Sequence, residues 1–140
     1  MDNFEIINVE EDKNKKPQLY SPAQLAFAGD AVYEMLVRAY IVKNLDYNAN
    51  RIHREAIKFV NAGAQARIIK ALMPHLTEEE LAVFKRGRNA KVTTAPKNQE
   101  MIDYRYATGF EALFGYLYLN NRGERIRELF DLIKDIVFKK

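Results

Sequence analysis

Two acidic residues stand out because each lies alone in a long apolar segment with a glycine close by. Asp30 follows Gly29 in LAFAGDAVYEML, residues 25–36, and Glu111 lies four residues before Gly115 in FEALFGYLYL, residues 110–119. A carboxylate against packed apolar side chains is costly unless a partner stabilises its charge. Glycine inside a helix adds roughly 1 kcal/mol to that cost. These two acids are therefore the residues whose positions most need a chemical explanation.

A metal ion held between two facing helices would explain both acids. Carboxylates that lie close together repel each other, and a hard cation between them removes the repulsion. The chain has no cysteine and only two histidines, so oxygen ligands for Mg²⁺ or Mn²⁺ are the chemistry available. Alternatively, Asp30, Glu34 and Arg38 form a narrow polar stripe that faces water, with the last two as an ordinary ion pair. The spacing leaves both interpretations open.

The segments that carry these acids have helical character. Ser21-Pro22 is typical of a helix start, and the first helix is expected to run to about residue 43. A second helical region is expected over about 51–73, and Gly63 is a candidate for a break within it. Thr77 and Glu80 form a capping box for a third helix, which Gly87 is predicted to end.

Two further helices are expected over about 99–119 and 124–138. The sequence has no alternating strand pattern with hairpin turns and no repeat of 20 residues or more. The predicted fold class is all-α. The polar residues 1–20 are expected to be a flexible lead, and residues 21–140 one domain.

The composition is that of a globular protein, with 48% hydrophobic and 29% charged residues among 140. The start of the chain has no apolar run of the signal-peptide kind, and the longest apolar runs fall well short of a membrane span, so we expect a cytoplasmic protein without a membrane partner. The net charge is only +3, but KRGRNAKVTTAPK, residues 85–97, holds five basic residues and no acid. Such a cluster indicates a polyanionic partner, and a solvated basic loop is the alternative.

Four segments, in this order and with these intervals, resemble the Mini-ribonuclease III family: LAFAGDAVYEMLVR, FKRGRNAK, TAPKN and YRYATGFEALFGYLYL. That family is the small bacterial branch of ribonuclease III that has the endonuclease domain only. The resemblance covers essentially residues 21–138. It implies a homodimeric helical bundle like the ribonuclease III endonuclease domain, with residues 21–140 as the catalytic domain and no double-stranded-RNA-binding domain after it.

The resemblance implies a Mg²⁺-dependent endoribonuclease that cuts double-stranded RNA, with Mn²⁺ able to substitute. The family matures the ends of precursor large-subunit (23S) ribosomal RNA, assisted by a large-subunit ribosomal protein. Asp30 matches the metal-binding catalytic aspartate of the family's GDA segment, and Glu111 matches the glutamate of its FEAL segment. The residues expected to bind RNA are the polar ones of the basic segment: Lys85, Arg86, Arg88, Asn89, Lys91 and Lys97.

The sequence departs from full-length ribonuclease III, which carries four acids in each site. Ala26 and Thr108 stand at the positions of the other two acids, as expected in the Mini branch, so one firmly held Mg²⁺ per site is predicted. Thr108 and Glu34 are candidates for a supporting role around the metal, although an ion pair with Arg38 is the simpler role for Glu34.

The resemblance also suggests that the first helix contributes to a dimer interface, and Leu25, Phe27 and Val32 lie away from its acidic stripe. Two rival interpretations of the whole chain remain. An all-α DNA-binding or adaptor module would need an exposed recognition helix, whereas the basic residues gather on a loop, so it ranks last. The other is a non-catalytic double-stranded-RNA-binding protein of the same fold. The presence of both acids argues against it.

Overall fold

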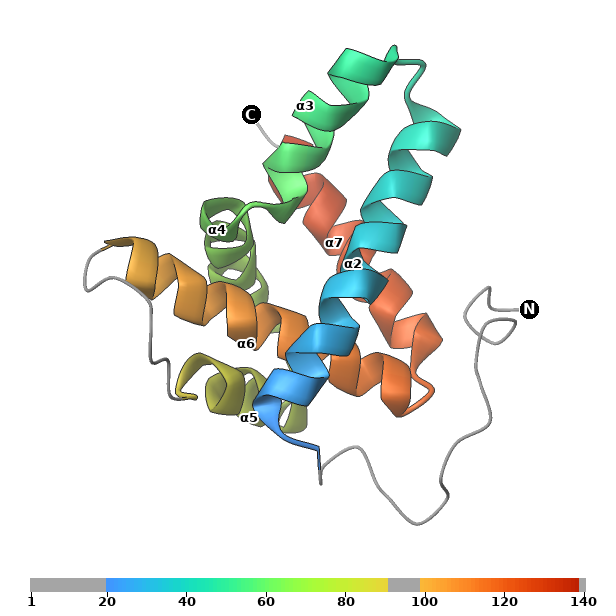
Figure 1. Ribbon diagram of the computed structural model, residues 1–140. Coiled ribbons are helices and arrows are strands. Elements are labelled where there is room, and N and C mark those ends of the chain that lie inside the picture. The colour runs from blue at the N-terminus through green and yellow to red at the C-terminus, as the bar shows by residue number, and fades with distance from the viewer. Residues whose placement is uncertain (1–19, 91–98, 139–140) are drawn as a thin grey trace.

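The computed structural model describes residues 20–90 and 99–138, and within these ranges the chain forms helices and no β-strand. The predicted all-α fold class is therefore confirmed. The expected flexible lead lies outside the described residues, apart from Tyr20. The elements in chain order are α2 (Pro22–Asn44), α3 (Ala49–Val60), α4 (Ala62–Leu72), the 3₁₀ helix η2 (Met73–His75), α5 (Glu78–Arg88), α6 (Gln99–Leu119) and α7 (Gly123–Phe138), as Figure 1 shows.

Short side chains cap the starts of the helices as the sequence predicts. The Ser21 hydroxyl accepts a hydrogen bond from the Gln24 backbone N–H at 3.1 Å, and the Gln24 side chain accepts one from Ser21 in return. Thr77 and Glu80 form the same reciprocal box at the start of α5. These bonds satisfy N–H groups that have no partner within the helix.

The break inside the second helical region falls at Asn61 rather than at Gly63. The Asn61 side chain accepts a hydrogen bond from the Ala64 backbone N–H at 2.7 Å, so it caps the start of α4. Gly63 lies within the first turn of that helix. The backbone N–H of Asn61 makes the last hydrogen bond of α3, to the carbonyl of Ile57. Its side chain starts α4, because it accepts a hydrogen bond from an N–H group that has no acceptor within that helix.

The prediction that Gly87 ends its helix is wrong. Helix α5 continues to Arg88, and Asn89 is its C-cap. A Cβ atom at Gly87 would lie 2.8 Å from the Cα atom of Gly109 on α6. Gly87 therefore serves the close packing of α5 against α6 rather than the termination of a helix.

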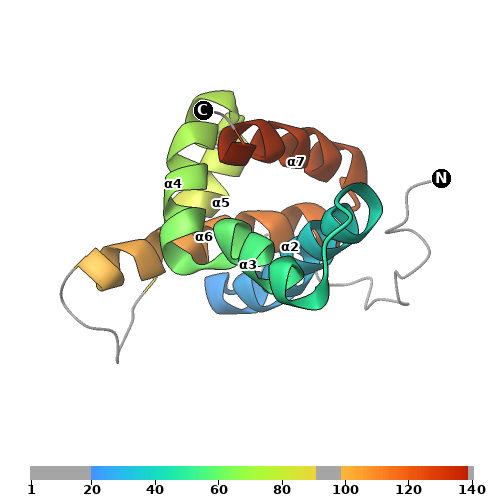
Figure 2. The same cartoon turned by 90° about the horizontal axis from the view of Figure 1, so that it is seen from above.

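Helix α6 is the centre of the packing, with α2, α4 and α5 against it (Figure 1). Figure 2 shows α7 on the opposite side of the molecule from the start of α2. On that side α7 packs against α4. The Tyr33 hydroxyl within the core donates a hydrogen bond to the backbone carbonyl of Phe59 at 2.8 Å. The largest fully buried side chains are Tyr33, Tyr116, Phe59, Phe84, Phe110, Phe114, Leu25, Ile41, Ile69, Leu72, Leu113 and Leu117.

A buried ion pair ties α5 to α7. The Arg125 guanidinium donates to both carboxylate oxygens of Glu80, at 2.8 and 2.9 Å, and to the backbone carbonyl of His75 at 2.8 Å. The Glu80 side chain is only 2% exposed. None of the helices in the described part of the chain has the length and apolar character needed to cross a membrane.

Candidate active site

The site forms where α2 crosses α6, and two glycines set how closely these helices approach. A Cβ atom at Gly29 would lie 1.6 Å from the carbonyl oxygen of Glu111, and one at Gly115 would lie 1.9 Å from that of Leu25. No side chain fits in either place, so the two backbones touch. Asp30 is the next residue after Gly29, so this contact brings its carboxyl to that of Glu111, which lies 81 positions later in the chain.

The two carboxyls differ in their surroundings. Asp30 is exposed and Glu111 is half-buried. Burial raises the pKa of the Glu111 carboxyl most, the charge of Asp30 and a hydrogen bond with it raise it further, and the amide of Gln65 lowers it. The result is a pKa of about 7 for Glu111. Near neutral pH the pair is therefore poised to release a proton when a cation approaches.

Gln65 of α4 is a site residue that the sequence analysis missed. Its Nε2 atom donates to Glu111 Oε2 at 3.5 Å and to the backbone carbonyl of Val60 at 3.0 Å. The side chain is buried between Ala64 and Ala66, both of which belong to the core. In the sequence Gln65 stands among small and apolar residues of a predicted helix, which is only a weak signal, because the burial that makes such an amide need partners is known from the structure alone.

The donor set fits a hard cation of the Mg²⁺ type. Residues 20–90 and 99–138 contain no group of three or more histidine, cysteine, aspartate or glutamate side chains that could hold a metal ion. Asp30 and Glu111 are thus a pair rather than a full cage. Mg²⁺ usually keeps several water ligands and binds one or two carboxylates, so a pair of this kind is sufficient.

The two residues proposed for a supporting role have other partners. Glu34 accepts a hydrogen bond from Arg38 Nε at 3.1 Å, which confirms the simple ion pair expected one turn after Asp30. The Thr108 hydroxyl donates to the backbone carbonyl of Tyr104 at 2.9 Å. A role for Glu34 or Thr108 around a metal stays a prediction.

The described part of the basic segment lies at the end of α5. Lys85, Arg86 and Asn89 are exposed, whereas Arg88 is half-buried with its guanidinium 5.6 Å from the ring centre of Phe84. Its Nε atom donates to Asn89 Oδ1 at 3.1 Å. Lys91 and Lys97 lie outside the described residues.

This end of α5 lies close to α6, the helix that carries Glu111. The contact between Gly87 and Gly109 places it against α6 two residues before Glu111. Tyr106, one turn before Gly109 on α6, has two cations near its ring, with Lys70 Nζ 4.7 Å and the Arg88 guanidinium 5.9 Å from the ring centre. The basic residues and Glu111 therefore belong to two helices that pack directly against each other.

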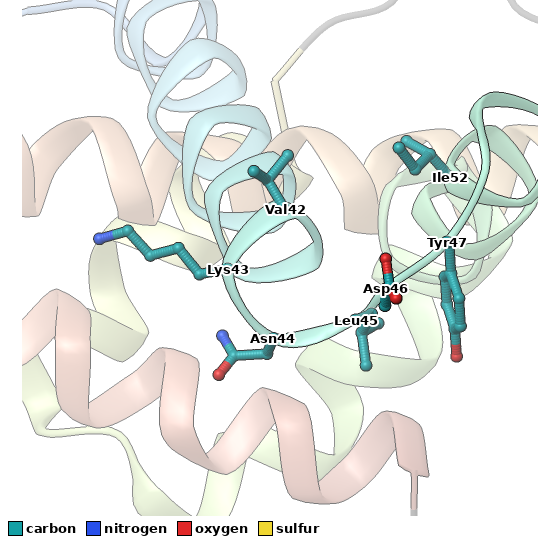
Figure 3. A pocket seen from close by; sticks show the side chains of 7 residues that line it. All are labelled: Val42, Lys43, Asn44, Leu45, Asp46, Tyr47 and Ile52. Atoms are coloured by element: carbon teal, nitrogen blue, oxygen red, sulfur yellow. The ribbon is translucent and has the colours of Figure 1, made fainter.

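A hollow of about 310 Å³ lies at the other end of α2, in the turn to α3 (Figure 3). Val42 is roughly 18 Å from Asp30 along the helix axis, at 1.5 Å per residue. The hollow is thus separate from the paired acids. It is lined by Val42, Lys43, Asn44, Leu45, Asp46, Tyr47 and Ile52.

Comparison with known proteins agrees with this fold. Residues 23–122 match the ribonuclease III domain. The chain is 50% identical to the Mini-ribonuclease 3 of Clostridium tetani over 81% of its length and 76% of that protein. It is 49% identical to the Mini-ribonuclease 3 of Brevibacillus brevis over 85% of its length and 89% of that protein. A crystal structure of a Fusobacterium nucleatum protein superposes with a TM-score of 0.77 at 32% identity, covering 86% of this chain and 98% of that one.

An all-α domain whose residues 23–122 match this family is a domain of the ribonuclease III class. The chain belongs to the ribonuclease III family, in its Mini-ribonuclease 3 branch. It is accordingly an endoribonuclease, and the family resemblance seen in the sequence is confirmed.

Proposed function

We propose that the chain is a Mg²⁺-dependent endoribonuclease that cleaves double-stranded RNA and matures the ends of precursor 23S ribosomal RNA in the cytoplasm. The observation that carries this proposal is the pairing of Asp30 with Glu111, whose pKa is raised to about 7 by burial and by its neighbour. Two acids held together against their mutual repulsion favour a function that uses a cation. The Mini-ribonuclease 3 relatives support RNA as the substrate.

Asp30 and Glu111 would hold the Mg²⁺ ion, with Mn²⁺ able to substitute. When bound, the ion would polarise the scissile phosphate and lower the pKa of a water molecule. Glu111 must lose its proton to take part, and the N–H group of Gln65 favours that ionised form. Hydrolysis adds water across one P–O bond, so that one RNA end keeps the phosphate and the leaving oxygen takes up a proton.

The basic end of α5 would hold the RNA duplex beside these acids. A-form RNA is bound mainly through phosphates and 2′-hydroxyls, because its deep groove hides the bases from side chains. Lys85, Arg86, Arg88 and Asn89 are suited to such contacts, and Lys91 and Lys97 would extend the same surface. In this proposal residues 21–140 act as the catalytic domain and contribute the RNA-binding surface themselves.

A homodimer would provide one site for each RNA strand. The outward face of α2 carries exposed apolar side chains at helical spacing: Phe27 is 85% exposed, Met35 41% and Val42 71%. Such a face on one helix favours an interface with another chain. Leu25 and Val32 belong to the core of the single chain, so Phe27 is the residue of the three considered that fits an interface. A large-subunit ribosomal protein would assist binding of the precursor.

Cleavage of a double-stranded RNA with and without Mg²⁺ tests the proposal, with Asp30→Asn and Glu111→Gln as variants. We expect magnesium-dependent cutting by the unaltered chain and a loss of at least about 100-fold in each variant, since each removes a metal ligand. Single-stranded RNA and duplex DNA serve as control substrates. Binding without cleavage, even with a ribosomal RNA precursor, would favour the non-catalytic RNA-binding alternative instead.

A further inference from the structure

Gln65 connects α4 to the catalytic acid on α6 and is 2% exposed. Its Nε2 atom has two acceptors, the backbone carbonyl of Val60 and the carboxylate of Glu111. Its Oε1 atom is buried and makes no hydrogen bond to any residue that the structure describes. One polar atom of this buried amide therefore has hydrogen-bond partners, and the other has none among the described residues.

We propose that Gln65 is a positioning residue for the cation site, which holds the Glu111 carboxylate through Nε2 and offers Oε1 to a water molecule beside the two acids. The inference rests on the proposed metal-dependent function. It assigns a role to a side chain that is neither an acid nor part of the basic segment.

The orientation of the amide supports this role. Both groups near Nε2 are acceptors, so the N–H groups must face them and Oε1 must point elsewhere. Native proteins place a buried acceptor of this kind where a water molecule or a ligand group can donate to it. The paired carboxyls of Glu111 and Asp30 are the ionisable groups close to this amide.

The anchoring of α4 makes the amide a stable support. The Asn61 cap fixes the first turn of the helix, and Gln65 lies one turn further on. Buried Ala64, Ala66 and Ile69 hold this part of α4 in the core. The amide of Gln65 can therefore restrict the rotamers of Glu111, as groups behind metal ligands commonly do.

The test is the affinity for Mn²⁺ in the absence of RNA, measured by electron paramagnetic resonance on the full chain. Gln65→Met keeps the length of the side chain and removes both hydrogen-bonding groups. We expect its Mn²⁺ affinity to fall about 10-fold or more. The kcat for duplex RNA is expected to fall while KM for the RNA stays within about twofold, because Gln65 acts on Glu111 and not on the duplex.

Ile69→Val is the matched control, since it removes one buried methylene group a turn further along the same helix. A purely structural role for Gln65 predicts that both variants lose stability and keep the Mn²⁺ affinity of the unaltered chain. If the Met variant does not fold, Gln65→Asn takes its place. That variant retains the amide but is too short to reach Val60 and Glu111 together, so its Mn²⁺ affinity is also expected to fall.

The outcomes separate the two proposals. If the unaltered chain binds no Mn²⁺, or binds it equally well after Asp30→Asn and Glu111→Gln, the metal-dependent function is overturned, and this inference with it. An unaltered chain with such a site, together with a Gln65 variant that binds Mn²⁺ equally well and keeps its kcat, would overturn the inference alone.

Discussion

A methyl group on Gly29 would lie 1.6 Å from the carbonyl oxygen of Glu111. The contact that packs α2 against α6 is therefore also the contact that brings Asp30 to Glu111. The fold and the site share this contact, so a change that separates the two helices separates the two acids. Packing requires the glycine beside Asp30, whereas the proposed binding of a cation accounts for Asp30 itself.

Gly29→Ala is predicted to destabilise the chain by about 3 kcal/mol or more, because its Cβ atom would meet backbone that cannot move aside. Urea unfolding measures the effect. Gly63→Ala is the control, since the nearest atom to its Cβ would lie at an ordinary 3.5 Å. That variant should be neutral or up to about 1 kcal/mol more stable, because alanine favours the helix. Equal stabilities of the two variants would contradict the close crossing.

Glu111→Gln is predicted to stabilise the metal-free chain at pH 8. Burial first, and Asp30 second, raise the pKa of Glu111 from 4.5 to about 7 in the folded chain. Between these values the folded state binds more protons than the unfolded state, so stability falls as pH rises. The variant lacks this penalty and should be about 1 kcal/mol more stable after allowance for solvent screening.

Thermal unfolding in a chelator at pH 8 and near pH 4.5 checks this sign. The advantage of the variant should be present at pH 8 and disappear at the lower pH, where Glu111 is protonated in the folded chain. Added Mg²⁺ should stabilise the unaltered chain at pH 8 and leave the variant unchanged, because a ligand stabilises only the state that binds it. A variant less stable at pH 8 would contradict the raised pKa.

Arg125→Ala is predicted to cost about 3 kcal/mol or more, because it leaves the 2%-exposed Glu80 carboxylate without its partner. Arg38→Ala is the comparison, since its ion pair with Glu34 is on the surface and should contribute less than about 0.5 kcal/mol. Chemical unfolding of both variants measures the difference. A similar small loss in both would mean that the buried pair does not join α5 to α7.

The same ion pair predicts a loss of stability in acid. Burial alone would raise the pKa of Glu80, but the hydrogen bonds from Arg125 and Thr77 and the charge of Arg125 lower it overall. The contribution of the pair is therefore complete above the unfolded value of 4.5 and is lost as pH falls through the lower folded value. Unfolding of the unaltered chain below that pH should show this slope, and Arg125→Ala should show less of it.

Lys85→Gln is predicted to weaken binding of duplex RNA to a similar extent for all sequences. One lost phosphate contact should reduce the slope of log affinity against log salt by about one. Lys43→Gln removes the same charge at the far end of α2, where Figure 3 shows its side chain, and should leave the slope unchanged. Binding titrations at several salt concentrations distinguish the two. If the two variants have equal slopes, the Lys85 side chain at the end of α5 makes no contact with the RNA phosphates.

Phe27→Glu is predicted to give a folded monomer if α2 forms the homodimer interface. A charge in an apolar interface is costly, whereas the same change at 85% exposure should not unfold the single chain. Ile57→Glu, on an exposed part of α3, is the control and should stay dimeric. Sedimentation equilibrium reports the state of each variant. An unaltered chain that is monomeric at micromolar concentration would contradict the dimer itself.

The sequence by itself determined the local structure and the chemical residues. Helix caps such as Ser21 and Thr77 involve hydrogen bonds between residues three positions apart, so they can be read from neighbours in the chain. Asp30 and Glu111 were recognisable because a charge inside an apolar helix requires a partner. The all-α class followed from the spacing of apolar residues, which is also a local property.

Only the tertiary structure decided how these parts act on one another. Gly87 has the sequence context of a helix end, but its contact with Gly109 shows that it permits close packing. Gln65 has no local signal strong enough to assign it to Glu111, which is 46 positions away. Helix faces, burial and the pKa of Glu111 depend on which helices meet and how closely, and residues distant in the chain set those contacts.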